Sequence, residues 1–297
     1  MSFTIANTLD DALTALAGGA RPIAGGTDLV VGARHGKAPL PEHLVAIDRL
    51  SELKAVTSTP EGVRIGALVS HHDIETHPLL TTVYAALADG SALVGSPATR
   101  HLGTIGGNLM NGSPAMDTGA PLAVLGAEVE LQSVRGSRRV PIGKLWTGPG
   151  RTSAEPDELC VAVHIPAPVE RSNSAYVRLE YRRAMEIAVV GAAAFVALAP
   201  DGTIAALRVG LTAVAPTILI SDLVGQVGSS VAEAAAAAAA LASEQATPIS
   251  DVRASEAYRR HTVGVMARRA VEAAACRAAG ETISTPVNRA IGIGAAS

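Results

Sequence analysis

Two glycine-rich segments place the strongest constraint on the fold of this chain. The first is residues 24–29 (AGGTDL); the second is residues 103–108 (GTIGGN), which runs on to 113–117 (SPAMD). Because glycine has no Cβ atom, backbone amides there can turn inward and approach a ligand closely. Successive inward amides form a nest for an anion such as phosphate. Two such segments, roughly 80 residues apart, are predicted to clamp the two halves of a pyrophosphate-linked cofactor. A tight turn between strands explains the first glycine pair equally well.

Polar side chains in both segments fit a nucleotide ligand. Thr27, Thr104 and Asn108 are potential donors, Asp28 holds its loop or accepts from a ligand, and Asp117 suits ribose or ribityl hydroxyls. The sequence contains no G-x-G-x-x-G, G-x-x-x-x-G-K-[ST], G-x-S-x-G or H-E-x-x-H motif. These residues therefore predict a nucleotide site outside the Rossmann and kinase types.

Composition narrows the class of protein further. Hydrophobic residues make up 48% and charged residues 17%, with a net charge of -3, which is typical of a globular protein and gives no reason to expect nucleic acid or an anionic membrane. The two cysteines, Cys160 and Cys276, are too few for an iron–sulfur cluster, which needs about four thiolates. Without a signal peptide, and with its longest apolar stretch at 187–199, the chain is expected in the cytoplasm without integral membrane association.

Periodicity divides the chain into two parts that meet at residues 166–174. The first part mixes short strands with helices, and the last third reads as three strands followed by two helices, which is an α+β pattern. The predicted helices are 9–17, 71–77, 80–92, 230–243 and 252–279. The predicted strands include 45–48, 63–66, 128–131, 176–181, 188–197 and 204–211. Residues 281–297 read as a loose tail.

At this point the sequence resembles a known family. Residues 24–29, 104–108 and 113–117, in this order, resemble the FAD-binding medium subunit of carbon monoxide dehydrogenase and the flavin domain of xanthine dehydrogenase, in the molybdenum hydroxylase family. The likeness covers nearly the whole chain, because residues 182–188 and 250–261 resemble the family's C-terminal domain.

The resemblance implies an α+β fold with two domains. A PCMH-type FAD-binding domain would span 1–170, with subdomains of about 1–55 and 56–170 and FAD extended between them. A C-terminal domain of three antiparallel strands plus helices, like that of the carbon monoxide dehydrogenase flavoprotein, would span 171–282, followed by a tail at 283–297.

By matching position, residues 23–28 and 104–108 would line the pyrophosphate and ribityl chain. Asp117 would hold flavin-side hydroxyls, Ile187 would pack on the isoalloxazine with Val94 and Cys160 nearby, and Arg178 stands where relatives often place a lysine beside the cofactor. The full expected set is Ile23, Ala24, Gly25, Gly26, Thr27, Asp28, Leu29, Val94, Thr104, Ile105, Gly106, Gly107, Asn108, Asp117, Cys160, Arg178 and Ile187. No metal ligand and no catalytic acid or base is expected in this chain.

The resemblance also implies a division of labour among subunits. A large subunit with a molybdenum cofactor would act on the substrate, and a small subunit would carry iron–sulfur clusters. FAD in this chain would receive the electrons and pass them to an external acceptor (quinone, NAD, oxygen or a carrier protein). The assembly would be a dimer of heterotrimers.

Two other functions compete with this one. A stand-alone FAD-dependent oxidoreductase of the same flavin fold would need its own acid–base residues, and the sequence offers no clear set. A non-catalytic scaffold would use the glycines only as turns. Copurifying subunits argue against the first alternative, and the absorption of bound flavin argues against the second.

Overall fold

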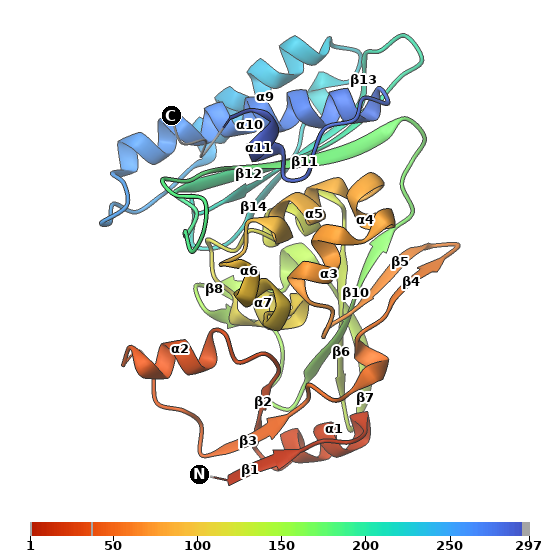
Figure 1. The fold of residues 1–297 in the computed structure, drawn as a ribbon. Helices are drawn as coiled ribbons and strands as arrows, with labels where there is room; N and C mark the ends of the chain where they lie inside the picture. Colours follow the sequence, from red (N-terminus) through yellow and green to blue (C-terminus); the bar gives the residue numbers. More distant parts are fainter. Residues whose placement is uncertain (1, 37, 293–297) are drawn as a thin grey trace.

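The N-terminal part of the chain forms a small parallel sheet. The structure is a computed structural model that describes residues 2–36 and 38–292, and the sheet has the order β1-β3-β2 (Figure 1). Its elements are β1 (Ser2–Ile5), helix α1 (Leu9–Ala17), β2 (Arg21–Ile23) and β3 (His43–Ala46). Thr8 and Asp11 cap α1 reciprocally, with Thr8 Oγ1 accepting from the Asp11 amide at 3.1 Å. This confirms the predicted helix 9–17.

A five-stranded antiparallel sheet follows, with the order β4-β5-β10-β6-β7. Its strands are β4 (Val56–Thr59), β5 (Gly62–Gly66), β6 (Glu128–Ser133), β7 (Gly136–Pro141) and β10 (Leu159–Pro166). Alternate residues of β6 are buried, as the pattern at 128–131 predicts. Short elements beside it are the 3₁₀ turns η1 (Ser51–Leu53) and η2 (Ile142–Lys144) and the ribbon of β8 (Trp146–Gly148) and β9 (Arg151–Thr152).

Six short helices lie between this sheet and the C-terminal sheet (Figure 1). They are α3 (His71–Thr76), α4 (Pro78–Thr82), α5 (Ala85–Ala92), α6 (Pro97–Leu102), α7 (Ile105–Asn111) and α8 (Gly119–Val124). Ser70 and Asp73 form a capping box at the start of α3, which confirms the predicted helix at 71–77. The predicted single helix 80–92 is wrong, because Tyr84 leaves helical geometry (φ -115°, ψ 43°) and separates α4 from α5. The Tyr84 hydroxyl donates to the Pro166 carbonyl at 3.2 Å.

The third sheet is antiparallel, with the order β11-β12-β13-β14. Its elements are β11 (Ser172–Leu179), β12 (Val190–Leu198), β13 (Ile204–Thr212), β14 (Leu219–Asp222), the 3₁₀ turn η3 (Val224–Gln226), α9 (Val231–Gln245) and α10 (Glu256–Ala278). Helices α9 and α10 pack on one face, and α5 and α8 pack on the other. Burial on both faces explains why β12 is apolar almost throughout. The sequence analysis predicted the first three strands and both long helices but missed the short strand β14.

The C-terminal segment is packed, which corrects the predicted loose tail. Helix α11 (Val287–Ala290) follows a cis Thr285–Pro286 bond, and Val287 is fully buried. The Asn288 side chain accepts from the Arg178 amide at 3.0 Å and donates to the Arg178 carbonyl at 2.8 Å. The segment therefore pairs with the free edge of β11, where backbone groups would otherwise lack partners. The rest of the predicted tail, 293–297, lies outside the described residues.

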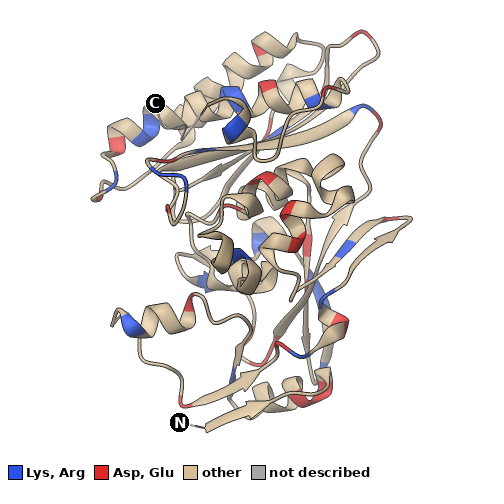
Figure 2. Cartoon of the chain, in the orientation of Figure 1, with Lys and Arg blue, Asp and Glu red and all other residues tan. Residues whose placement is uncertain are grey.

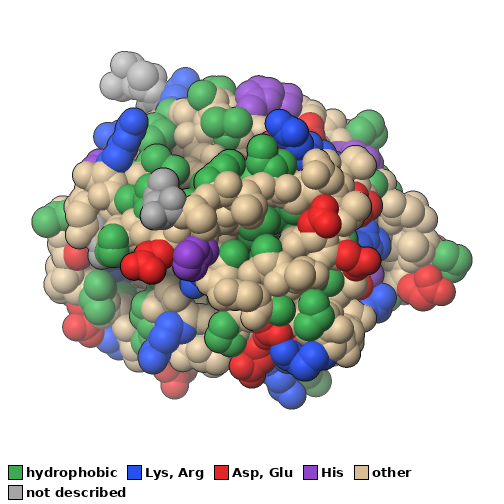
Figure 3. Space-filling model, turned by 90° about the horizontal axis from the view of Figure 1, so that it is seen from below, with side chains coloured by type: hydrophobic (Ala, Val, Ile, Leu, Met, Phe, Trp, Pro, Cys, Tyr) green, Lys and Arg blue, Asp and Glu red, His purple; other side chains and the backbone are tan. Residues whose placement is uncertain are grey.

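Charges of both signs are interspersed along the chain (Figure 2). Seen from below, the molecule shows apolar side chains distributed among acidic and basic ones (Figure 3). Across residues 2–36 and 38–292, no helix combines the length and apolar character needed to cross a membrane.

Candidate functional site

The structure brings the two glycine-rich segments into direct contact. A Cβ atom built on Gly25 would lie 1.8 Å from the Leu102 carbonyl oxygen and 3.3 Å from the Gly103 nitrogen. A Cβ atom on Gly103 would lie 3.5 Å from Thr27 Oγ1. Because real Cβ atoms do not approach other atoms within 3.0 Å, only glycine at position 25 allows this approach. The two segments therefore form one continuous surface.

The first segment offers backbone amides to a ligand. It leaves β2 at Ile23, turns at Gly26 in the left-handed region (φ 68°) and enters helix α2 (Leu29–Arg34). In the described part of the chain, no protein acceptor bonds to the amides of Gly25, Gly26 and Thr27. A run of half-buried amides without acceptors is the arrangement that binds a phosphate oxygen. Asp28 is exposed at the start of α2, a helix that buries none of its residues.

The second segment differs from its prediction as a flexible loop. It is helix α7, and Thr104 caps it by accepting from the Gly107 amide at 3.1 Å. The amides of Ile105 and Gly106 donate to the carbonyls of Val69 and Ala67 at 3.0 and 2.9 Å. Gly106 is required for packing, since a Cβ there would lie 2.7 Å from Ala67 Cβ. The amides of Ile105, Gly106 and Gly107 are therefore bonded within the protein, and the run of consecutive amides without acceptors lies in the first segment.

Side chains of the second segment keep a possible ligand role. Gly107 is exposed, and Asn108 is half-buried on the same turn. Asn108 Oδ1 accepts from the Thr118 hydroxyl at 2.6 Å, which orients its NH₂ group as a donor. This fits the prediction that Asn108 is a side-chain donor, although no contact in the structure tests it.

A buried histidine lies below the junction of the two segments. His71 is 1% exposed, its Cδ2 atom lies 3.3 Å from the position of a Gly103 Cβ, and its amide donates to the Gly103 carbonyl at 3.1 Å. Burial, followed by the positive charge of Arg100, lowers the pKa of His71 to about 4. The ring is therefore neutral at physiological pH. The sequence analysis explained this histidine only as part of a helix start.

A second group of predicted residues gathers where α5 meets the β11–β12 loop. Val94 is half-buried in the turn after α5, and Ile187 is 47% exposed in the β11–β12 loop. The Met185 amide donates to the Gly95 carbonyl at 2.9 Å, which joins the loop to the turn. Val94 and Ile187 thus lie on neighbouring segments. This arrangement is needed if both side chains are to contact the same isoalloxazine ring.

Asp117 and Arg178 form a buried ion pair beside this group. Arg178 Nη1 lies 2.7 Å from Asp117 Oδ2, and the Tyr176 hydroxyl donates to Asp117 Oδ1 at 2.9 Å. Burial raises the pKa of Asp117 to about 6, and Arg178 and Tyr176 oppose this rise only in part. Arg178 is 0% exposed and also pairs with Glu180. The predicted ligand contacts of Asp117 and Arg178 stay predictions, because the structure assigns both charges to this pair.

Cys160 is buried, whereas Val94 and Ile187 are partly exposed. It is 4% exposed in β10, inside the core of the five-stranded sheet, and burial raises the pKa of its thiol to about 12. A buried, protonated thiol is a small hydrophobic side chain. The predicted position of Cys160 near a flavin ring stays a prediction.

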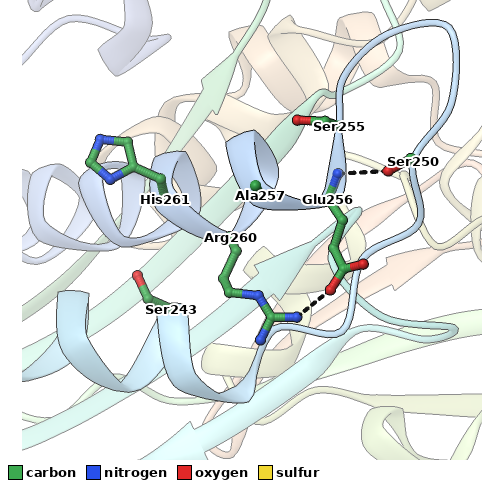
Figure 4. Close-up of a pocket in the computed structure, with 7 residues that line it drawn as sticks. All are labelled: Ser243, Ser250, Ser255, Glu256, Ala257, Arg260 and His261. Carbon is green, nitrogen blue, oxygen red and sulfur yellow. Dashed lines mark hydrogen bonds and ion pairs between the residues drawn. The ribbon is translucent and has the colours of Figure 1, made fainter.

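One pocket of the structure is lined by Ser243 and by residues 250–261, and it does not include the glycine segments. It has a volume of about 640 Å³ and lies between the end of α9 and the start of α10 (Figure 4). Arg260 in its wall is already paired with Glu256. Residues 25–27 of the first segment are half-buried, and Gly107 of the second segment is exposed, so both segments reach the surface.

Comparison with known proteins decides the family. Residues 1–168 match the family model described as the FAD binding domain in molybdopterin dehydrogenase. Residues 175–274 match the model described as the CO dehydrogenase flavoprotein C-terminal domain. The chain belongs to the FAD-binding medium subunits of the molybdenum hydroxylases. It is thus a flavoprotein subunit of a molybdenum-dependent oxidoreductase.

Curated relatives resemble this medium subunit over nearly its full length. The chain is 32% identical over 287 residues to a putative xanthine dehydrogenase FAD-binding subunit of Escherichia coli, covering 94% of this chain and 98% of the relative. It is 36% identical over 269 residues to the carbon monoxide dehydrogenase medium chain of Afipia carboxidovorans, covering 90% and 92%.

Solved structures confirm the fold class of the medium subunit. The chain matches reconstituted CO dehydrogenase from Oligotropha carboxidovorans with a TM-score of 0.88 and 33% identity, covering 93% of this chain and 98% of the other. It matches quinoline 2-oxidoreductase from Pseudomonas putida 86 with a TM-score of 0.86 and 28% identity, covering 94% and 98%.

Proposed function

We propose that this medium subunit relays electrons from iron–sulfur clusters of a small partner subunit to an external acceptor, while a large molybdenum subunit acts on the substrate. The names of its relatives support this proposal, because they include medium chains of carbon monoxide and glyceraldehyde dehydrogenases and one subunit of a dehydrogenase complex. The chain itself contains only two cysteines, and the more deeply buried one, Cys160, stands alone in a core. Clusters that need about four thiolates must therefore lie on another chain.

The contact between Gly25 and the backbone at Leu102 and Gly103 is the observation that carries the assignment of the cofactor site. It sets three amides without acceptors, those of Gly25, Gly26 and Thr27, beside the second segment. These amides would offset the charge of the FAD pyrophosphate, and Thr27 would add a hydroxyl donor. The residues present therefore fit the cofactor that the family binds.

The remaining predicted contacts extend this surface toward the C-terminal sheet. Asn108 would donate to the ribityl or ribose hydroxyls, and Val94 and Ile187 would enclose the isoalloxazine ring. Bound FAD supplies a centre that accepts electrons singly and delivers a pair, and the protein supplies position and electrostatics. We assign no general acid or base to this chain.

Substitutions in the two segments test the cofactor site. Gly26→Val places a β-branched side chain at φ 68°, and Thr104→Val removes the cap of α7; both variants are expected to purify without FAD. Gly228→Val is a matched control, because Gly228 also has a positive φ (85°) but no atom lies within 4 Å of its Cβ position. Stoichiometric flavin in both site variants would contradict the assignment.

The subunit organisation requires a separate experiment. We expect native purification to yield this chain with a large molybdenum subunit and a small iron–sulfur subunit, as a dimer of heterotrimers. Mass spectrometry of the intact complex would identify both partners and the stoichiometry. Adding substrate to the complex should then bleach the flavin absorption. An isolated chain that turns over substrate alone would support a stand-alone oxidoreductase and overturn the proposal.

A further inference from the structure

Arg178 is connected to the two backbone segments that precede Val94 and Ile187. Its Nη1 atom donates to the Leu93 carbonyl at 2.9 Å and to the Glu186 carbonyl at 3.3 Å. Leu93 and Glu186 immediately precede the two residues that are expected to enclose the flavin ring. The guanidinium itself is 0% exposed, so it reaches the ring residues only through the backbone.

The turn that carries Val94 is fixed at three consecutive carbonyls. Leu93 accepts from Arg178, Val94 accepts from Arg100 Nη1 at 3.3 Å, and Gly95 accepts from the Met185 amide at 2.9 Å. Two of these donors, Arg178 and Met185, belong to β11 and the β11–β12 loop. The turn and the loop are therefore held as one unit, with Arg178 at its buried side.

Buried carboxylates hold the guanidinium in its orientation. Asp117 binds Nη1 at 2.7 Å, and Glu180 accepts from Nε at 3.1 Å and also from Nη2. A planar guanidinium bound on two sides has little rotational freedom. A lysine at this position would keep the charge but would provide a single nitrogen in place of the fork.

We propose that Arg178 is a positioning residue that sets the separation of Val94 and Ile187, and through it the environment of the flavin ring. This inference rests on the proposed function, because it takes the predicted ring contacts as given. In this role Arg178 acts on the ring residues through the backbone and needs no contact of its own with the cofactor. Ring contacts on both sides adjust the properties of a bound flavin, so a displaced contact changes its spectrum and potential.

The test compares two buried arginines in the protein purified with its natural partners. Arg178→Lys is expected to shift the flavin reduction potential and the visible circular dichroism, and to weaken FAD binding about tenfold, as loss of one charge-assisted hydrogen bond would. Arg277→Lys is the matched control. Arg277 is 7% exposed and pairs with Asp89 at 2.7 Å, but it contacts the carbonyls of Ser174 and Ile283 instead of the ring segments.

A double variant separates positioning from general destabilisation. If Arg178 acts through Ile187, the shift caused by Arg178→Lys should shrink in an Ile187→Ala background, because the two effects are then not additive. If Arg178→Lys does not fold, Glu180→Gln serves instead, since it loosens the guanidinium while keeping the side chain's shape. It is expected to shift the potential in the same direction by a smaller amount.

The outcomes are distinguishable. A flavin shift in Arg178→Lys or Glu180→Gln, absent from Arg277→Lys and reduced by Ile187→Ala, supports the inference. Equal flavin properties in the Arg178, Glu180 and Arg277 variants would overturn it and leave the proposed function intact. A wild-type chain that takes up no FAD would overturn the proposed function itself.

Discussion

Gly25→Ala is the substitution that tests the backbone contact between the two glycine segments most directly. The new Cβ atom would lie 1.8 Å from the Leu102 carbonyl oxygen and 2.5 Å from its carbon. The nearest acceptable distance is 3.0 Å, so the two backbones must separate by about 1 Å. Both neighbours are backbone atoms, and no side-chain rotation can relieve the contact.

The cost of this displacement follows from overpacking and from lost ligand contacts. Forcing one extra methyl group into a close-packed site typically costs about 1–3 kcal/mol. If the interaction of the displaced amides with the pyrophosphate weakens by the same free energy, the dissociation constant of FAD rises by roughly 5- to 150-fold. We therefore expect Gly25→Ala to fold with a lowered melting temperature and to bind FAD far more weakly than the wild type.

Gly32→Ala provides the matched control for this prediction. Gly32 lies in α2, seven residues further along, and no atom lies within 4 Å of its Cβ position. Alanine also favours a helix over glycine by roughly 1 kcal/mol. Flavin fluorescence during titration of the cofactor-free proteins measures the dissociation constants. Equal constants for Gly25→Ala, Gly32→Ala and the wild type would refute the claim that the contact shapes the site.

Three further predictions concern stability. Burial favours the neutral form of His71, so its contribution to the free energy of unfolding is complete above the unfolded pKa of 6.5 and is lost as the pH falls toward the folded pKa of about 4. In His71→Gln, the free energy of unfolding should therefore fall by about 3 kcal/mol less than in the wild type between pH 7 and pH 4, as measured by urea unfolding. Asp89→Ala leaves the buried Arg277 unpaired and should cost about 3–5 kcal/mol in the same assay. Asn288→Ala removes two hydrogen bonds to Arg178 and should lower stability by about 1–3 kcal/mol, with faster hydrogen exchange at the β11 edge.

Local signals in the sequence were sufficient to predict the helices that begin at a capping residue and have apolar residues at helical spacing. α1 and α3 begin at capping boxes, and α10, predicted over 252–279, buries Val263, Met266 and Ala270, which are spaced to lie on one helix face. Glycine-rich α7 was read as a loop because glycine disfavours helices. Gly106 is required there, because a Cβ atom would lie 2.7 Å from Ala67 Cβ and 2.9 Å from the Ala67 carbonyl oxygen.

Partners distant in the sequence could not be predicted. Asp117 and Arg178 are separated by 61 residues, and Asp89 and Arg277 by 188. The resemblance indicated Asp117 and Arg178 as positions beside the cofactor, but their pairing with each other was not expected, because an ion pair leaves no spacing pattern in a sequence. The paired glycines of the first segment could be recognised in the sequence because their effect on the backbone is local, and the ligand role of their amides stays a prediction.

The flavin content of this chain, purified with its natural partner subunits, tests the central claim most directly. Denaturation releases bound FAD, and its absorption gives the amount per chain. The two joined glycine segments predict one FAD per chain in the native protein and uptake of one FAD by the cofactor-free chain. A folded chain that is colourless and takes up no FAD would contradict the account.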